Sequence, residues 1–146
     1  MVALIVTATP AHSQGWREFQ AGALAVASRP AFGGLAIGLG LRDRGRTRLS
    51  LQVAGGAFDE GTAAGRIEAV WNFLLDPQRT TGVAIYGGGG AALSTLRGGR
   101  LRGSVLVLLG LENRPGSRSS RFVEIGVGGG ARIAAGFRSR VRLPLR

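Results

Sequence analysis

Residues 123–146 read VEIGVGGGARIAAGFRSRVRLPLR, and their side chains change character from one position to the next. The odd positions from 123 to 133 are apolar or glycine, and valine or leucine returns at positions 141, 143 and 145. The even positions carry Glu124, several glycines and the arginines. A period of two residues is that of a β-strand, whose successive side chains point to opposite faces. This stretch therefore predicts strand structure with one apolar face and one polar face.

The same alternation extends through the chain from Phe19 onward. Turn signals divide it into eight segments, and the odd positions inside them hold no polar or charged residue. Because these odd positions share one face, each strand should pair odd residues with odd residues of its neighbour. The segments are residues 19–27, 31–41, 49–57, 67–75, 83–93, 101–111, 123–133 and 141–145, and the expected turns lie at Arg29-Pro30, 43–46, 59–61, Asp76-Pro77, 97–99, 113–117 and Gly136.

One segment, TAAGRIEAVWNFLLDP at residues 62–77, also fits a helix when taken by itself. Its apolar positions 67, 70, 71, 74 and 75 would line one face of a helix. We interpret it as a strand because the other seven segments all favour strands. The fold class predicted is therefore all-β, with eight antiparallel strands in an up-and-down barrel.

Two kinds of eight-stranded barrel fit this pattern. A soluble barrel places its apolar face inside and its polar face in water, whereas a membrane barrel places the apolar face toward lipid. The mixed face here is rich in glycine and has no lysine, unlike the Thr, Lys and Glu of soluble strand surfaces. All the segments except the last also have the length of about 9–11 residues that a membrane strand needs. We therefore predict a transmembrane barrel.

The polar face carries charges of both signs, which a closed lumen could neutralise as hydrogen-bonded ion pairs. A lumen of eight strands is just wide enough for side chains, and glycines would leave room for the long ones. The alternative interpretation of these charges is scattered surface charge. The residues expected in this lumen charge network are Glu18, Arg48, Arg66, Glu68, Arg102, Glu124, Arg132, Arg140 and Arg142.

The apolar face is uniform out to the ends of the segments, as lipid requires. An arginine at the bilayer midplane costs about 2–4 kcal/mol, so charges are excluded there. Phe19, Trp71, Phe73 and Phe137 lie on this face and could form part of an interfacial girdle. The residues expected to face lipid are Leu35, Ile37, Leu39, Leu51, Val53, Trp71, Phe73, Val105, Val107, Leu109, Val123, Ile125, Val127 and Leu143.

The chain of 146 residues is long enough for one domain, predicted here over residues 15–146. Residues 1–14 are predicted to be a secretory signal peptide, since an apolar run from Val2 to Val6 is followed by small residues and by Ala11-His12-Ser13. A positive region before that run is missing. Export to the outer membrane follows from this interpretation.

The net charge of +11 raises the question of nucleic-acid binding. The arginines are spread along the chain at alternate positions and are not gathered in a helix or tail, and no recognition motif surrounds them. We therefore expect no nucleic-acid partner. Polyanion binding by an arginine-rich surface is the third and weakest hypothesis.

No catalytic site is expected. The one histidine, His12, lies in the predicted signal, and Ser50 and Ser104 have no candidate base. The three glutamates of the lumen network could act as general acids or bases, but we interpret them as counter-ions to arginine. There is no cysteine, and the runs YGGGGAAL and GVGGGA lack the Gly-Lys-Ser/Thr of a phosphate-binding loop. We predict no metal and no cofactor.

The chain from about Trp16 to Arg146 resembles the small eight-stranded outer-membrane barrels of the OmpA/OmpX type. The resemblance rests on the alternation, the signal-like start and the run GVGGGARIAAGFRSRVRLPLR, which is similar to the last two strands of many such barrels. The chain departs from the class in ending on Leu145-Arg146, where an aromatic residue is usual, and in having Pro144 in the last segment. All its expected connections are short, and we expect the longest over residues 112–120, on the periplasmic side.

The resemblance implies an integral outer-membrane barrel of a Gram-negative bacterium, in contact with membrane lipids. With a filled, salt-bridged lumen, the expected role is structural or accessory in an envelope assembly with other protein chains, and a porin-like passive pore is the less favoured form. The alternative is a secreted soluble eight-stranded barrel that binds an apolar ligand in its interior.

Overall fold

The computed structural model describes residues 16–43 and 46–141, apart from the side chain of Arg97. Within these residues the chain forms eight β-strands and one short 3₁₀ helix. The elements are β1 (Trp16–Ala27), β2 (Phe32–Arg42), β3 (Thr47–Phe58), β4 (Ala63–Leu74), β5 (Val83–Thr95), η1 (Arg97–Gly99), β6 (Leu101–Asn113), β7 (Ser119–Val127) and β8 (Ala131–Val141).

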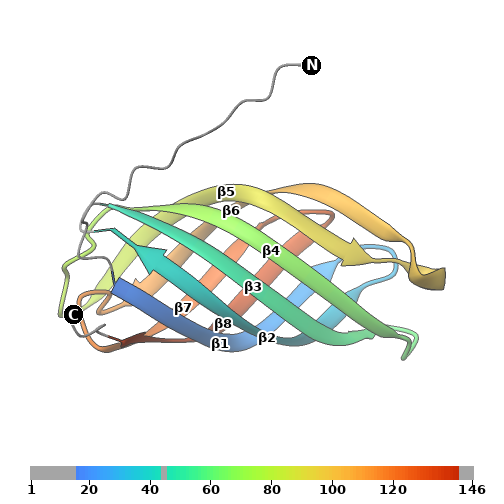
Figure 1. Cartoon of the computed structure of the whole chain (residues 1–146), viewed down its shortest axis with the longest axis horizontal. Coiled ribbons are helices and arrows are strands. Elements are labelled where there is room, and N and C mark those ends of the chain that lie inside the picture. The colour runs from blue at the N-terminus through green and yellow to red at the C-terminus, as the bar shows by residue number, and fades with distance from the viewer. Residues whose placement is uncertain (1–15, 44–45, 142–146) are drawn as a thin grey trace, which may run out of the picture.

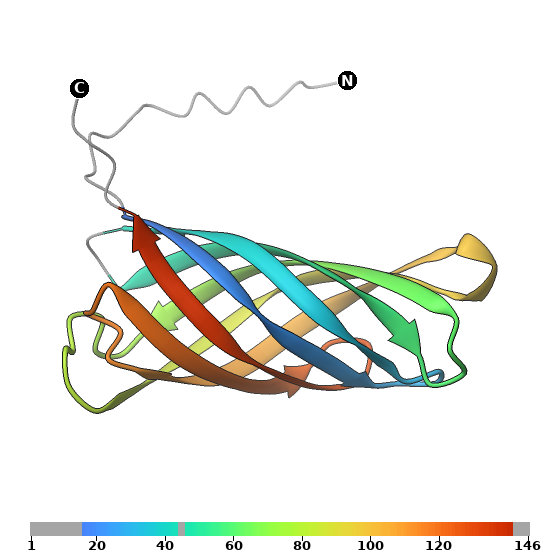
Figure 2. The ribbon, with the colours of Figure 1, turned by 90° about the horizontal axis from the view of Figure 1, so that it is seen from below.

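The strands form a closed antiparallel barrel in chain order. Each strand pairs with the next, and β1 pairs with β8 to close the sheet, so Ala23 lies opposite both Leu35 and Ala135. The strands run obliquely around an elongated barrel (Figures 1 and 2). β1 begins and β8 ends at the same end of the barrel, which we call the terminal end. The β1–β2, β3–β4, β5–β6 and β7–β8 connections lie at the opposite end, the distal end, where the β5–β6 hairpin extends farthest (Figure 2).

The predicted register parity is confirmed at all eight strand pairs. Odd residues lie opposite odd residues, as Ile37 lies opposite Val53 and Ala21. Even residues lie opposite even residues, as Glu68 lies opposite Gln52 and Ala92. Since strand side chains alternate between faces, one face of the whole barrel is odd-numbered and the other is even-numbered.

The apolar odd-numbered face is the outer surface. Every described residue that was expected to face lipid is exposed on it, and Leu143 lies outside the described residues. The even-numbered side chains fill the interior, in part as two apolar clusters. One cluster contains Phe32, Phe58 and Phe122, and the other contains Tyr86 and Leu106. The soluble alternative requires the odd-numbered apolar face to line the interior, and this placement is wrong because that face is exposed.

The last hairpin differs from its predicted position. We expected a turn at Gly136, but the turn lies at residues 128–130, and Gly136 is in the middle of β8 opposite Gly22. A Cβ atom at Gly136 would lie 2.2 Å from the carbonyl oxygen of Ala21. This glycine therefore serves the close approach of two strands. The three-residue turn contains Gly129, whose φ of 77° is in the left-handed region that favours glycine.

Residues 63–74 form strand β4, so the strand interpretation of this segment is confirmed and the helical one is wrong. Four exposed aromatic side chains, Phe19, Trp71, Phe73 and Phe137, lie on the parts of β1, β4 and β8 near the terminal end. The described part of the chain contains no helix of the length and apolarity needed to cross a membrane.

Candidate functional site

The interior of the barrel buries an unusual number of charged side chains. Charged side chains are rarely buried unless they are paired. Here they project from even positions of seven different strands, so that the closed sheet brings them together from residues up to 122 positions apart. The buried charged residues are Glu18, Arg42, Arg48, Arg66, Glu68, Glu112, Glu124, Arg132 and Arg138, and Arg140 is half-buried.

These ten side chains form one alternating series, which we call the ion-pair ladder. At its distal end, Arg66 Nε lies 2.6 Å from Glu68 Oε1. Glu68 also accepts from Arg132, whose Nη2 lies 2.8 Å from Oε2. Arg132 Nη1 reaches Glu124 Oε2 at 3.0 Å, and Glu124 Oε1 lies 2.7 Å from Arg138 Nη2. Each carboxylate here thus lies between two guanidinium groups.

The ladder continues without a break to the terminal end. Arg138 Nη1 and Arg48 Nη2 both bind Glu112 Oε2, at 3.0 and 2.8 Å. Arg48 Nε lies 2.6 Å from Glu18 Oε2. Glu18 Oε1 is 3.0 Å from Arg140 Nε and 3.3 Å from Arg42 Nη1. The series therefore begins and ends with arginine.

Neutral side chains satisfy much of the remaining hydrogen-bonding capacity of the ladder. Tyr86 donates its hydroxyl to Glu124 at 2.6 Å and accepts from Arg138 at 3.0 Å. Ser120 donates to Glu112 at 2.6 Å, and Gln52 donates to Glu68. Buried ion pairs are stable only when such extra hydrogen bonds accompany them. The ladder is therefore part of the packed interior.

Tyr86 depends on a glycine across the sheet. Gly110 lies opposite Tyr86 in the β5–β6 pair, and a Cβ atom at Gly110 would lie 2.2 Å from Cζ of the Tyr86 ring. Any larger residue would push the ring away from Glu124 and Arg138. The expectation that glycines make room for long interior side chains fits this position.

The middle of the lumen contains little free space. A cavity of about 10 Å³, lined by residues that include Gln20, Asn72 and Arg138, lies beside the ladder. A water molecule needs roughly 10–15 Å³ by this measure, so the cavity holds about one water at most.

The ladder contains six arginines and four glutamates, an excess of two positive charges. Because both ends of the series are arginine, this excess lies toward the two mouths of the barrel. At the terminal end, Arg42 donates to the carbonyl oxygens of Pro115 (2.9 Å) and Pro77. At the distal end, Arg66 donates to the carbonyl oxygen of Gly128 at 2.8 Å.

Seven of the nine residues predicted for the lumen network lie in the ladder. Arg102 does not, since it is exposed at the distal mouth and pairs with no carboxylate among the described residues. Its place in the predicted network is therefore corrected. β6 begins beyond the closed part of the barrel, and an even position there faces the mouth. Arg142 lies outside the described residues. The seven are Glu18, Arg48, Arg66, Glu68, Glu124, Arg132 and Arg140.

Sequence reasoning missed Arg42, Glu112, Arg138 and Tyr86. All four are at even positions, so the same parity rule could have found them. Glu112 was missed because residues 112–120 were expected to form the longest connection. Instead Glu112 ends the inward-facing part of β6, Ser120 lies in β7, and the two side chains are hydrogen-bonded. The longer connection is residues 75–82, between β4 and β5 at the same end.

The geometry gives these glutamates the role of counter-ions. Each carboxylate lies within 3.3 Å of at least two guanidinium groups. Ser50, considered above as a nucleophile, lies 3.4 Å from the amide nitrogen of Asn72. Within the described residues no three His, Cys, Asp or Glu side chains are grouped as a metal site would require.

Comparison with known proteins agrees with this architecture. No protein-family model matches the chain, and no curated protein is similar to it in sequence. Among solved structures, the N-terminal β-barrel domain of Pseudomonas aeruginosa OprF superposes with a TM-score of 0.59 at 12% identity, covering 88% of this chain and 98% of that one. The fold is that of the small outer-membrane β-barrels. Neisserial surface protein A (NspA) has the same TM-score at 16% identity, covering 90% of this chain and 98% of its own.

Proposed function

We propose that this chain is an integral outer-membrane barrel with a closed lumen and a structural or accessory role in the cell envelope. The observation that carries the proposal is the inversion of the barrel, with charge inside and apolar side chains outside. Leu35, Leu39, Val105 and Leu109 are each at least 60% exposed. A soluble monomer rarely exposes a contiguous apolar surface of more than a few hundred Å². An apolar outer surface of this kind is suited to contact with lipid.

The small-barrel fold supports membrane embedding, and the ladder supports the absence of a pore. Its ten charged side chains run from one mouth toward the other, and the central cavity is about 10 Å³. With short connections at both ends, the barrel offers little loop surface for receptor binding. We therefore propose that its contacts are lateral, with membrane lipids and other envelope proteins.

Reconstituted in planar lipid bilayers, the folded barrel is expected to give no discrete conductance steps. Opening a path would require breaking buried pairs such as Arg138–Glu124, whose side chains are only 2% and 5% exposed. The measurement is single-channel recording in symmetric salt, with a wide porin inserted under the same conditions as the positive control. Regular, protein-dependent steps would contradict the closed lumen and favour the passive pore.

We also propose that residues 1–14 are an export signal and that the mature chain begins near Gln14 or Gly15. The support is the apolar run followed by Ala11-His12-Ser13. Intact-mass measurement of protein purified from the membrane of an expressing Gram-negative cell should show a chain that starts near residue 15. A mass that retains Met1 would exclude cleavage.

A further inference from the structure

The distal mouth of the barrel contains a cavity that is lined by arginine, serine and phenylalanine side chains, among others. It has a volume of about 40 Å³ and lies among the β1–β2 hairpin, β3, β4, β5, β6 and the turn between β7 and β8. By the measure of roughly 10–15 Å³ for one water, about three waters would fill it. It is therefore large enough for a small oxyanion.

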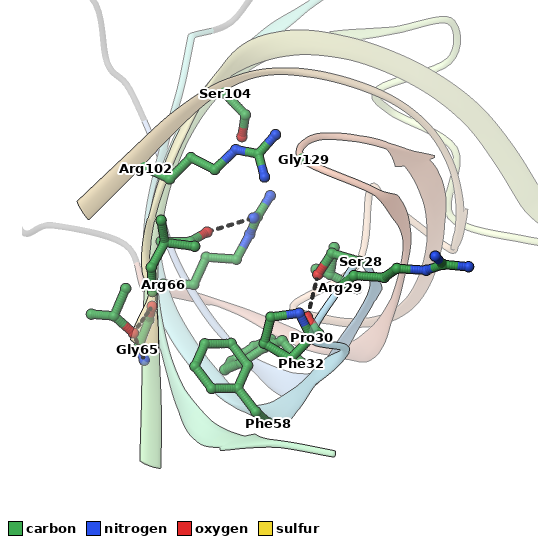
Figure 3. A pocket seen from close by; sticks show the side chains of 14 residues that line it. Ser28, Arg29, Pro30, Phe32, Phe58, Gly65, Arg66, Arg102, Ser104 and Gly129 are labelled. Carbon is green, nitrogen blue, oxygen red and sulfur yellow. Dashed lines mark hydrogen bonds between the residues drawn. The ribbon is translucent and has the colours of Figure 1, made fainter. Parts of the chain in front are cut away.

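Three arginines line this cavity. Arg29 lies in the β1–β2 connection, with its guanidinium group directed away from the other two (Figure 3), and the other two project from different strands. Arg66 of β4 is 4% exposed, and Arg102 of β6 is exposed at the mouth. Figure 3 shows both side chains extending into the same space, with their guanidinium groups toward one another. Two like charges in one cavity repel unless an opposite charge lies between them.

Arg66 and Arg102 have N–H donors that make no hydrogen bond within the described residues. Arg66 uses Nε for Glu68, one Nη1 hydrogen for Ser94 and one Nη2 hydrogen for the carbonyl of Gly128. A guanidinium has five N–H donors, so two remain on Arg66. Within the described residues, Arg102 has no ion pair and no hydrogen bond to another side chain. Its whole guanidinium fork is available.

Hydroxyl groups and an apolar base complete the cavity. Ser94 and Ser104 line it together with the arginines, and Phe32 and Phe58 line it from the start of β2 and the end of β3 (Figure 3). Ser94 accepts from Arg66 at 2.8 Å, which leaves its own hydroxyl hydrogen free to donate. A low-dielectric base strengthens the attraction between the arginines and an anion.

We propose that the distal mouth binds a phosphate monoester through Arg66 and Arg102. The cavity offers several hydrogen-bond donors: two N–H groups of Arg66, the guanidinium fork of Arg102 and the two serine hydroxyls. These are more than the two oxygens of a carboxylate accept in a cavity of this size. They match the three terminal oxygens of a phosphoryl group, for which arginine forks are well suited. The ligand is either a soluble phosphorylated molecule or the phosphorylated headgroup of a lipid. The site is independent of the structural role proposed above.

The test is isothermal titration calorimetry, in which glycerol 3-phosphate is added to the folded barrel in zwitterionic detergent at low salt. Saturable binding at one site is expected. Arg102→Gln should weaken it by about tenfold or more, because charge-assisted hydrogen bonds contribute about 1.5–3 kcal/mol each. Arg102 is used because Arg66 is part of the ladder and its replacement could unfold the barrel. The Ser104→Ala variant should weaken binding less, since it removes a neutral donor.

Arg100→Gln is the matched control, because Arg100 is an exposed arginine at the same end of the barrel that does not line the cavity. Equal weakening by Arg100→Gln and Arg102→Gln would mean diffuse attraction to a basic rim and would overturn the proposal. So would the absence of binding to both glycerol 3-phosphate and bilayer discs that contain phosphatidic acid. Binding to the discs alone, lost in Arg102→Gln but not in Arg100→Gln, would assign the site to a lipid headgroup. Binding to soluble glycerol 3-phosphate with the same variant pattern would assign it to a solute.

Discussion

Replacing Glu68 by glutamine is expected to lower the free energy of unfolding of the barrel by about 3–5 kcal/mol, the usual effect of removing one partner from a buried ion pair. Glu68 lies between Arg66 at 2.6 Å and Arg132 at 2.8 Å, and it also accepts from Gln52. Its side chain is almost fully buried, at 1% exposure for the residue. The substitution preserves its volume and leaves two buried guanidinium groups without their shared charge.

The measurement is equilibrium unfolding in urea of the barrel folded in phospholipid vesicles, monitored by the fluorescence of its two tryptophans, Trp16 and Trp71. Asp76→Asn is the control for losing one negative charge, because Asp76 and Arg79 are about half exposed and their atoms are 3.9 Å apart. Its expected effect is less than about 1 kcal/mol, as for exposed pairs in general. If Glu68→Gln were no more destabilising than Asp76→Asn, the ladder would not stabilise the interior and the proposal of a closed lumen would lose its support.

The face of each side chain could be predicted from sequence because it depends only on local geometry. Strand side chains alternate, and closing the sheet with same-parity registers extends one local rule around the whole barrel. The same rule assigns no depth along the axis. Arg102 and Arg132 are both even, yet one is exposed at the mouth and the other is buried beside Glu68. That difference depends on how far β6 extends beyond its neighbours, and the odd or even position of a residue does not predict this length.

The sequence also could not predict which arginine of the ladder pairs with which glutamate. Glu124 binds Arg132 and Arg138, although neither is its direct partner in the β7–β8 register, where Glu124 lies opposite Ala134. Long arginine side chains reach across the lumen and along it, so their partners depend on strand tilt and on the space that neighbours leave. Gly136 shows a similar ambiguity, because a glycine in a strand pattern can mark a turn or a close approach of two backbones.

A single arginine at Ile37 is expected to be among the most damaging changes on the outer surface, although Ile37 is 59% exposed. Ile37 is the central residue of β2, and its neighbours across the sheet are the apolar Ala21 and Val53. If this apolar outer surface faces lipid, Ile37 lies close to the bilayer midplane, where an arginine costs about 2–4 kcal/mol. We expect Ile37→Arg to reduce the free energy of unfolding in vesicles by that amount.

Leu41→Arg is the matched control, since Leu41 is on the same strand and face with 58% exposure. Leu41 lies near the terminal end opposite Arg17, an exposed arginine on the outer surface. The outer surface at this level thus already carries a charge, and an interfacial position should accept another at a cost of about 0–1 kcal/mol. In a water-soluble barrel both arginines would be solvated, and both changes would stay within about 0.5 kcal/mol. A large effect at Ile37 together with a small one at Leu41 therefore requires lipid around the middle of the barrel, and equally small effects at both would contradict membrane insertion.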